Sequence, residues 1–276
     1  MHKIITILFL INFCNYTIFA HGDLDKRIQA KTKAIAQAPK NSTLYLERGF
    51  LYHQHEEWDN ALADYLQAQE LGLQEKILYY RMAETYLELY LFKSGLICTQ
   101  QYLAQDSLDV KIHKLRGELF YKSRAYDDAI YSFEYVIQHS VDLTPENYVT
   151  LADVYATKGI SQKNLALEVI EQGLEKLGSQ VFVLQEQKLK YYKKFNLTKQ
   201  ALAQYDIIIN SNTRKERWYY QKASYLYQQK KFKAAKTHAE AAKKAFEMLK
   251  PHQQKTKAMI QLLANIHTLL QNLENQ

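Results

Sequence analysis

A period of 34 residues constrains the fold of this chain more than any other feature of its sequence. A bulky residue, a small residue and a second bulky residue recur at this interval, as Tyr45, Gly49 and Tyr52, then Tyr79, Ala83 and Tyr86, then His113, Gly117 and Phe120. A second group follows each triplet: Ala61, Tyr65 and Ala68, then Gly95, Thr99 and Tyr102, then Ala129, Phe133 and Val136. Offsets of three and four place residues on one face of a helix, so each period predicts two helices.

The small residue of each triplet has a packing role. It marks the point at which two helix backbones approach most closely, and the larger residues fill the grooves beside it. One helical hairpin cannot bury its own apolar face, so neighbouring hairpins must stack on one another. Pro39, Pro145 and Pro251 all fall at expected boundaries, where they interrupt no helix. The pattern therefore predicts a chain of stacked helical hairpins.

These residues resemble the tetratricopeptide repeat (TPR), in which a bulky residue, a small residue and Tyr precede Ala, an aromatic residue and Ala in a second helix. The resemblance covers nearly all of the chain that follows the N-terminal segment. It implies an all-α fold, namely a right-handed α-solenoid of about six TPR helical hairpins with a C-terminal capping helix.

The period also predicts the organisation of the chain. We expect a signal peptide over 1–22, an N-terminal helix over 23–41, six repeats over 42–250 and a capping helix over 251–276. The repeats are expected at 42–75, 76–109, 110–145, 146–180, 181–214 and 215–250. The fifth is the least regular, because either Leu189 or Lys188 must occupy its small-residue position. The polar side of the capping helix, with Gln261 and Asn265, is expected to face solvent.

The N-terminal segment has the pattern of a secretory signal. Lys3 precedes a short apolar run over 4–11, and small residues follow at Ala20 and Gly22. The run is shorter than the ~20 residues that a membrane-spanning helix needs. Cleavage after Ala20 and cleavage after Gly22 both fit the sequence. We expect an exported protein of bacterial type, located in the periplasm, in the cell envelope or outside the cell, with no transmembrane span in the mature chain.

Residues that could support catalysis or bind a metal are few. The sequence contains no phosphate-binding GxxxxGK[ST], GxGxxG, HExxH or CxxC motif. Removal of the signal peptide would leave Cys98 as the one thiol, which excludes an internal disulfide. His53 and His55 come nearest to a metal site, but residues two apart on a helix point in different directions. The sequence predicts no enzyme, no metal and no cofactor.

The TPR resemblance implies a second stripe of residues, on the first helix of each repeat, that lines a concave groove. In the first three repeats these groove residues include Leu46, Phe50, Tyr80, Glu84, Lys114 and Tyr121. Some TPR proteins hold carboxylates there with a clamp of Lys and Asn. Leu46 and Phe50 stand where that clamp has its first Lys and Asn, so the sequence gives no support for this clamp.

Charge is unevenly distributed along the chain. Residues 181–260 contain 18 Lys and Arg but only 5 Asp and Glu. The lysines could simply solvate helix faces, or they could form a basic half-groove for an acidic partner. The same stripe, extended into the last two repeats, gives Lys190, Lys193, Arg217, Tyr220 and Tyr227 as further groove residues.

Together these features predict an exported, non-enzymatic TPR scaffold that binds a protein or peptide, with an acidic segment as one possibility. The alternative is an anionic ligand or polysaccharide bound by the basic C-terminal half. Nucleic acid is not expected, because export and the absence of a nucleic-acid-binding module argue against it.

Overall fold

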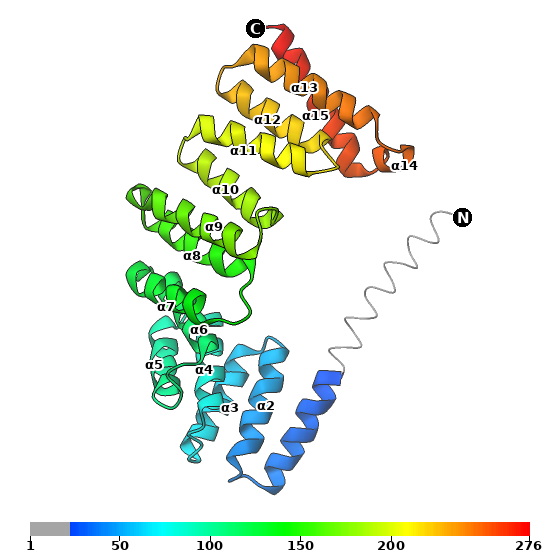
Figure 1. The fold of residues 1–276 in the computed structure, drawn as a ribbon. Coiled ribbons are helices and arrows are strands. Elements are labelled where there is room, and N and C mark those ends of the chain that lie inside the picture. The colour runs from blue at the N-terminus through cyan, green and yellow to red at the C-terminus, as the bar shows by residue number, and fades with distance from the viewer. Residues whose placement is uncertain (1–22) are drawn as a thin grey trace, which may run out of the picture. The chain divides into compact units, whose positions relative to one another are not determined.

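The computed structural model describes residues 23–276, and all regular structure within this range is helical (Figure 1). Residues 23–37 are helical, and fourteen labelled segments follow. These are α2 Ser42–Gln54, α3 Trp58–Glu70, α4 Lys76–Glu88, α5 Phe92–Leu103, α6 Val110–Lys122, α7 Tyr126–His139, α8 Pro145–Lys158, α9 Lys163–Leu177, α10 Phe182–Lys194, α11 Thr198–Ser211, α12 Glu216–Gln228, α13 Phe232–Glu247, α14 Pro251–Gln254 and α15 Lys257–Glu274. The signal peptide predicted over 1–22 lies outside the described residues.

Consecutive helices from α2 to α13 pack in six pairs, which confirms the predicted solenoid of helical hairpins. Each of the first three pairs occupies one sequence period. The small residues lie at close contacts, as expected. A Cβ atom added to Gly49 would lie 2.6 Å from Cε1 of Tyr65, and one added to Gly117 would lie 2.9 Å from the Phe133 ring. Glycine therefore permits an approach that a larger residue would block.

Five of the six hairpins share one turn geometry. Its central residue has a left-handed backbone conformation although it is not glycine, with φ between 56° and 65° at Glu56, Tyr90, Arg124, Asn196 and Lys230. The N–H of the next residue donates to a carbonyl in the last helical turn, as from Leu91 to Tyr86 at 2.8 Å. This bond closes the first helix of the hairpin in the manner of a Schellman motif.

The fourth hairpin departs from this geometry. A short 3₁₀ turn, Ile160–Gln162, separates α8 from α9. The interval from Tyr155 to Ala166 is two residues longer than the matching interval from Tyr52 to Ala61, and the insertion lies at this turn. The added residues replace the three-residue turn that joins the helices of the other hairpins.

The described chain divides into two compact units, with the boundary between Asp142 and Leu143. Unit 1 holds the first three hairpins and unit 2 the last three. The residues at the start of α8 explain why α7 and α8 do not form one continuous helix. Pro145 occupies its first position, and Thr144 and Asn147 form a capping box.

The last helix of unit 2 buries an apolar face against the sixth hairpin. Leu262, Ile266, Leu269 and Leu273 are its buried residues, and Thr256 caps it by accepting the Met259 N–H. Pro251 begins the short helix α14 that precedes it. Among residues 23–276, no helix combines the length and apolar character needed to cross a bilayer.

Candidate partner-binding clefts

The first helices of three consecutive hairpins form a cleft in unit 1, with a volume of about 280 Å³. Its lining comes from α2, α4 and α6: His53, Tyr80, Glu84, Leu87, Glu88, Lys111, Lys114, Leu115 and Glu118. We call it the unit 1 cleft. Three of the predicted groove residues, Tyr80, Glu84 and Lys114, therefore meet in one place.

The unit 1 cleft carries charges of both signs. Arg81 Nη1 lies 2.8 Å from Glu84 Oε2, so one of its carboxylates already has a partner. Burial and the neighbouring Glu84 raise the pKa of Tyr80 to about 12, so its hydroxyl stays protonated at neutral pH. Burial lowers the pKa of His53, which favours the neutral ring. The cleft thus offers aromatic, aliphatic and polar contacts with little net charge.

The other predicted groove residues of unit 1 lie elsewhere. Phe50 lines a separate cavity of about 310 Å³ together with Arg27, Ala30, Lys31, Glu47 and Leu51. Its ring lies 4.2 Å from the Arg81 guanidinium carbon. Leu46 packs against the core of unit 1, and the Tyr121 ring lies 6.1 Å from that of Tyr126. The helical segment 23–37 contacts α2 beside Phe50, through a Lys31–Glu47 ion pair of 2.5 Å.

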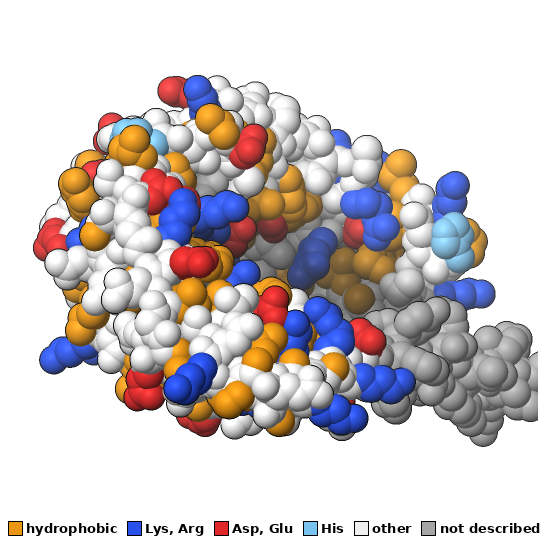
Figure 2. All heavy atoms as spheres, turned by 90° about the horizontal axis from the view of Figure 1, so that it is seen from below, with side chains coloured by type: hydrophobic (Ala, Val, Ile, Leu, Met, Phe, Trp, Pro, Cys, Tyr) orange, Lys and Arg blue, Asp and Glu red, His pale blue; other side chains and the backbone are white. Residues whose placement is uncertain are grey.

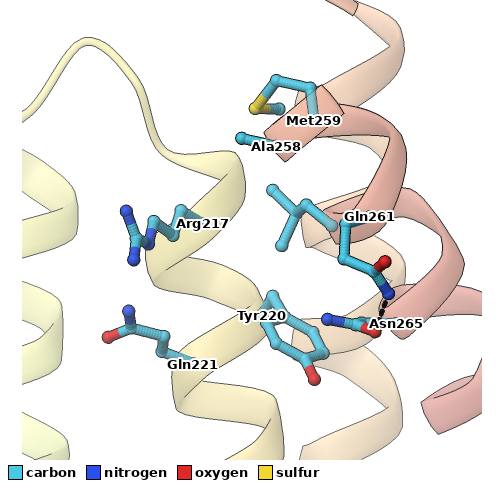
Figure 3. A pocket seen from close by; sticks show the side chains of 8 residues that line it. Arg217, Tyr220, Gln221, Ala258, Met259, Gln261 and Asn265 are labelled. Carbon is cyan, nitrogen blue, oxygen red and sulfur yellow. Dashed lines mark hydrogen bonds between the residues drawn. The ribbon is translucent and has the colours of Figure 1, made fainter. Parts of the chain in front are cut away.

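Unit 2 contains a pocket of about 290 Å³ between α12 and α15 (Figure 3). We call it the α12–α15 pocket. Its lining consists of Arg217, Tyr220, Gln221, Ala258, Met259, Gln261, Leu262 and Asn265. Two predicted groove residues, Arg217 and Tyr220, belong to it. Arg217 is the one charged residue among the eight.

The remaining predicted residues of unit 2 do not line this pocket. Lys190 lies 3.8 Å from the Asp153 carboxylate, and Lys193 lies 5.8 Å from the centre of the Tyr225 ring. The Tyr227 ring packs against Phe232 at 5.5 Å. The basic residues proposed from the sequence therefore belong to different local environments.

Gln261 and Asn265 are the site residues that sequence reasoning did not find. The sequence places them on the solvent side of the capping helix. Gln261 is exposed and Asn265 is half-buried, and both also line the α12–α15 pocket. Gln261 Nε2 donates to Asn265 Oδ1 at 3.0 Å. Two amides four residues apart on a helix were the available signal, but their partner surface on α12 depends on the tertiary packing.

His53 and His55 have separate partners in the structure, and Cys98 is buried. His53 Nδ1 lies 3.1 Å from the Thr85 hydroxyl, whereas His55 Nδ1 lies 2.7 Å from Glu57 Oε1, so the two rings have different partners. Burial raises the pKa of Cys98 to about 11, which keeps the thiol protonated. Within residues 23–276, no group of three His, Cys, Asp or Glu side chains could hold a metal.

The charged side chains on the face shown in Figure 2 are interspersed with each other and with hydrophobic groups.

Comparison with solved structures identifies the fold. The C-terminal part of a TPR repeat-containing protein from Cytophaga hutchinsonii matches 90% of this chain and 98% of its own, with 17% identity and a TM-score of 0.67. The chain has a tetratricopeptide-repeat fold. A tetratricopeptide repeat protein from Parabacteroides merdae matches 91% of this chain and 95% of its own, with 16% identity and a TM-score of 0.56.

A MamA protein also shares the fold. It matches 64% of this chain and 94% of its own, with 14% identity and a TM-score of 0.55. No protein-family model matches the sequence, and no curated protein matches it significantly. The TPR pattern is therefore retained in the backbone and at a few packing positions, while most of the sequence differs.

Proposed function

We propose that this protein is an exported, non-enzymatic scaffold that binds an extended protein segment in the unit 1 cleft. The observation that carries the proposal is the alignment of α2, α4 and α6 along one cleft that presents Tyr80, Leu87 and Lys114 together. Aromatic and aliphatic side chains supply contact area, and charges of both signs fix the register of a bound chain. A TPR fold commonly presents such a surface, which supports the same conclusion.

Site-specific cross-linking tests the cleft. A photoreactive amino acid placed at Leu87 should capture a partner protein in the native cell, whereas one placed at Lys93, an exposed residue of α5 outside the cleft, should not. Tyr80→Ala combined with Lys114→Glu should abolish capture from Leu87. Equal capture from both positions, or capture that survives the double substitution, would show that the cleft is not the binding surface.

Export is tested on the protein from its native cell. The positively charged start, the short apolar run and the small residues that follow support cleavage after Ala20 or Gly22. N-terminal sequencing should then give a chain that starts at His21 or Asp23, in a fraction outside the cytoplasm. Recovery of protein that begins at Met1 would contradict export.

A further inference from the structure

Three polar side chains in the α12–α15 pocket are not used by the fold. The Arg217 guanidinium, the Tyr220 hydroxyl and the Gln221 amide form no hydrogen bond or ion pair within residues 23–276. Two cations close to them in sequence are engaged. Arg214 Nε lies 2.7 Å from Glu216 Oε1, and Lys222 Nζ lies 2.5 Å from Asp206 Oδ1. Arg217 differs from these two residues in having a free guanidinium that lines a pocket.

The pocket arranges these groups around an apolar floor. Arg217 and Gln221 project one helical turn apart from the side of α12 that faces away from α15, while the Tyr220 ring lies between α12 and Asn265 of α15 (Figure 3). Leu262 is buried at the helix contact, and a hydrogen bond joins the two amides of α15, Gln261 and Asn265. Donors and acceptors thus lie on both sides of the Tyr220 ring (Figure 3).

This lining has a definite ligand preference. No carboxylate is among the eight lining residues, so nothing in the lining neutralises Arg217. A guanidinium binds a carboxylate through two parallel hydrogen bonds, and the primary amides of Gln and Asn match the donors and acceptors of a peptide backbone. We propose that the α12–α15 pocket binds a carboxylate group of an extended protein segment, with the adjoining peptide units held by Gln221 and Asn265.

Charge and size favour this occupant over a polyanion. A polyanionic chain is retained by several unpaired cations in a row, but Arg217 is the one charged lining residue, the Arg214 guanidinium beside Met259 is paired with Glu216, and Lys190 lies beside Asp153. A volume of about 290 Å³ accommodates a few atoms beyond one carboxylate, and Tyr220 and Leu262 supply the apolar contact for a neighbouring side chain. The inference rests on the proposed function, since both hold that the chain binds an extended protein segment.

Arrays of octapeptides test the pocket with the full chain. Each sequence is presented in two forms of the C-terminus, as the free carboxylate and as the amide. Each is also presented with its acidic side chains intact, as Asp and Glu, and with these replaced by Asn and Gln. This design separates a terminal carboxylate from a side-chain carboxylate. The chain should bind preferentially to peptides that carry either a terminal or a side-chain carboxylate. Arg217→Gln should weaken the selected peptides about 10- to 100-fold, and Arg217→Lys should restore part of the binding because charge returns without the planar fork.

Lys236→Gln is the matched control. It removes the same charge from an exposed position of α13 in the same unit and should leave the affinity unchanged. Both residues are exposed, so thermal unfolding should be the same for all three variants. If the selected peptides bind equally well to Arg217→Gln but lose affinity when Lys114 is changed, the proposed carboxylate subsite is wrong. The proposed function would then still hold. No binding of any peptide, with Arg217-dependent binding of an oligogalacturonate instead, would overturn both.

Discussion

The first and fifth hairpins close in different ways. In α2 and α3 the backbone at Gly49 lies against the Tyr65 ring, and no other side chain could fit between them. In α10 and α11 the same position holds Leu189, which is buried, and the two backbones approach each other over a shorter stretch. There the Gln204 amide donates to the Gln185 carbonyl at 3.2 Å.

The fifth hairpin is also joined to the fourth by a polar cluster. Asp153 Oδ1 of α8 accepts a hydrogen bond from Gln187 at 2.9 Å and another from the Tyr191 hydroxyl at 2.8 Å. The first hairpin also has a buried polar contact, since Arg48 Nε of α2 donates to Asp64 Oδ2 of α3 at 2.7 Å. The two hairpins thus differ in how closely their backbones approach, and both are supported by polar groups. We expect the first hairpin to be sensitive to added volume at Gly49 and the fifth to the loss of the acceptor at Asp153.

The largest effect should come from Asp153→Ala. The change removes the acceptor shared by Gln187 and Tyr191, at a cost of about 2–4 kcal/mol in the stability of unit 2. Asp153→Asn keeps one carbonyl oxygen and should cost clearly less. Hydrogen exchange measured peptide by peptide should show faster exchange in α8 and α10. Equal exchange rates in wild type and Asp153→Ala would show that the polar cluster does not stabilise α8 and α10.

Added volume should have the next largest effect. Gly49→Leu places a side chain where even a Cβ atom would lie 2.6 Å from Tyr65 Cε1, so we expect a loss of about 1–3 kcal/mol, or more if α2 separates from α3. At the corresponding position of unit 2, Leu189→Met conserves volume and should cost less than about 1.5 kcal/mol. Urea unfolding followed by circular dichroism measures both. Equal losses would show that the two hairpins close in the same way.

The turns offer a smaller, stabilising change. Arg124 has a left-handed backbone conformation, with φ of 65°, which is strained for arginine but not for glycine. Arg124→Gly should therefore raise the free energy of unfolding by about 0.5–1 kcal/mol, although glycine has more conformational freedom in the unfolded chain. Asn196 occupies the same turn position in unit 2, and asparagine tolerates this conformation better. Asn196→Gly should therefore raise the free energy of unfolding by less than Arg124→Gly. A lower melting temperature for Arg124→Gly would contradict the strain argument.

The smallest effect should be a pH dependence. Burial lowers the pKa of His53 in unit 1 and of His238 in unit 2. A histidine with a lowered pKa in the folded state contributes stability above its ordinary pKa of about 6.5, and this is lost as the pH falls through the lowered value. Both units should lose stability below pH 6.5. His53→Gln should reduce this loss in unit 1 alone, as measured by hydrogen exchange at pH 7.5 and 5.5.

Much of the fold was predictable because its main signals are local. Helical spacing, the glycines at close contacts and the three prolines all act within one hairpin or at its ends. The period alone did not predict the division at Asp142, because the compactness of each unit depends on contacts between hairpins. The exposed side chains at the left-handed turns also gave no signal, since a bond between backbone groups closes these turns.

The candidate site was predictable only in part. Tyr80, Glu84 and Lys114 follow from the register of successive first helices, which the period determines. Phe50 was assigned to the same groove, but it lies in a separate cavity beside the segment 23–37, whose packing has no counterpart in the repeat. The α12–α15 pocket depends on how the capping helix docks, and one helix in isolation carries no information about that contact.

The left-handed turns bear on how such a chain diverges in evolution. Glu56, Tyr90, Arg124, Asn196 and Lys230 differ in charge and size, yet they occupy one backbone conformation. Because a main-chain bond holds the turn, selection can replace its side chains freely while the helices stay in place. Sequence similarity can therefore decay rapidly at the hairpin tips without loss of architecture, and new surface contacts can arise there at little structural cost.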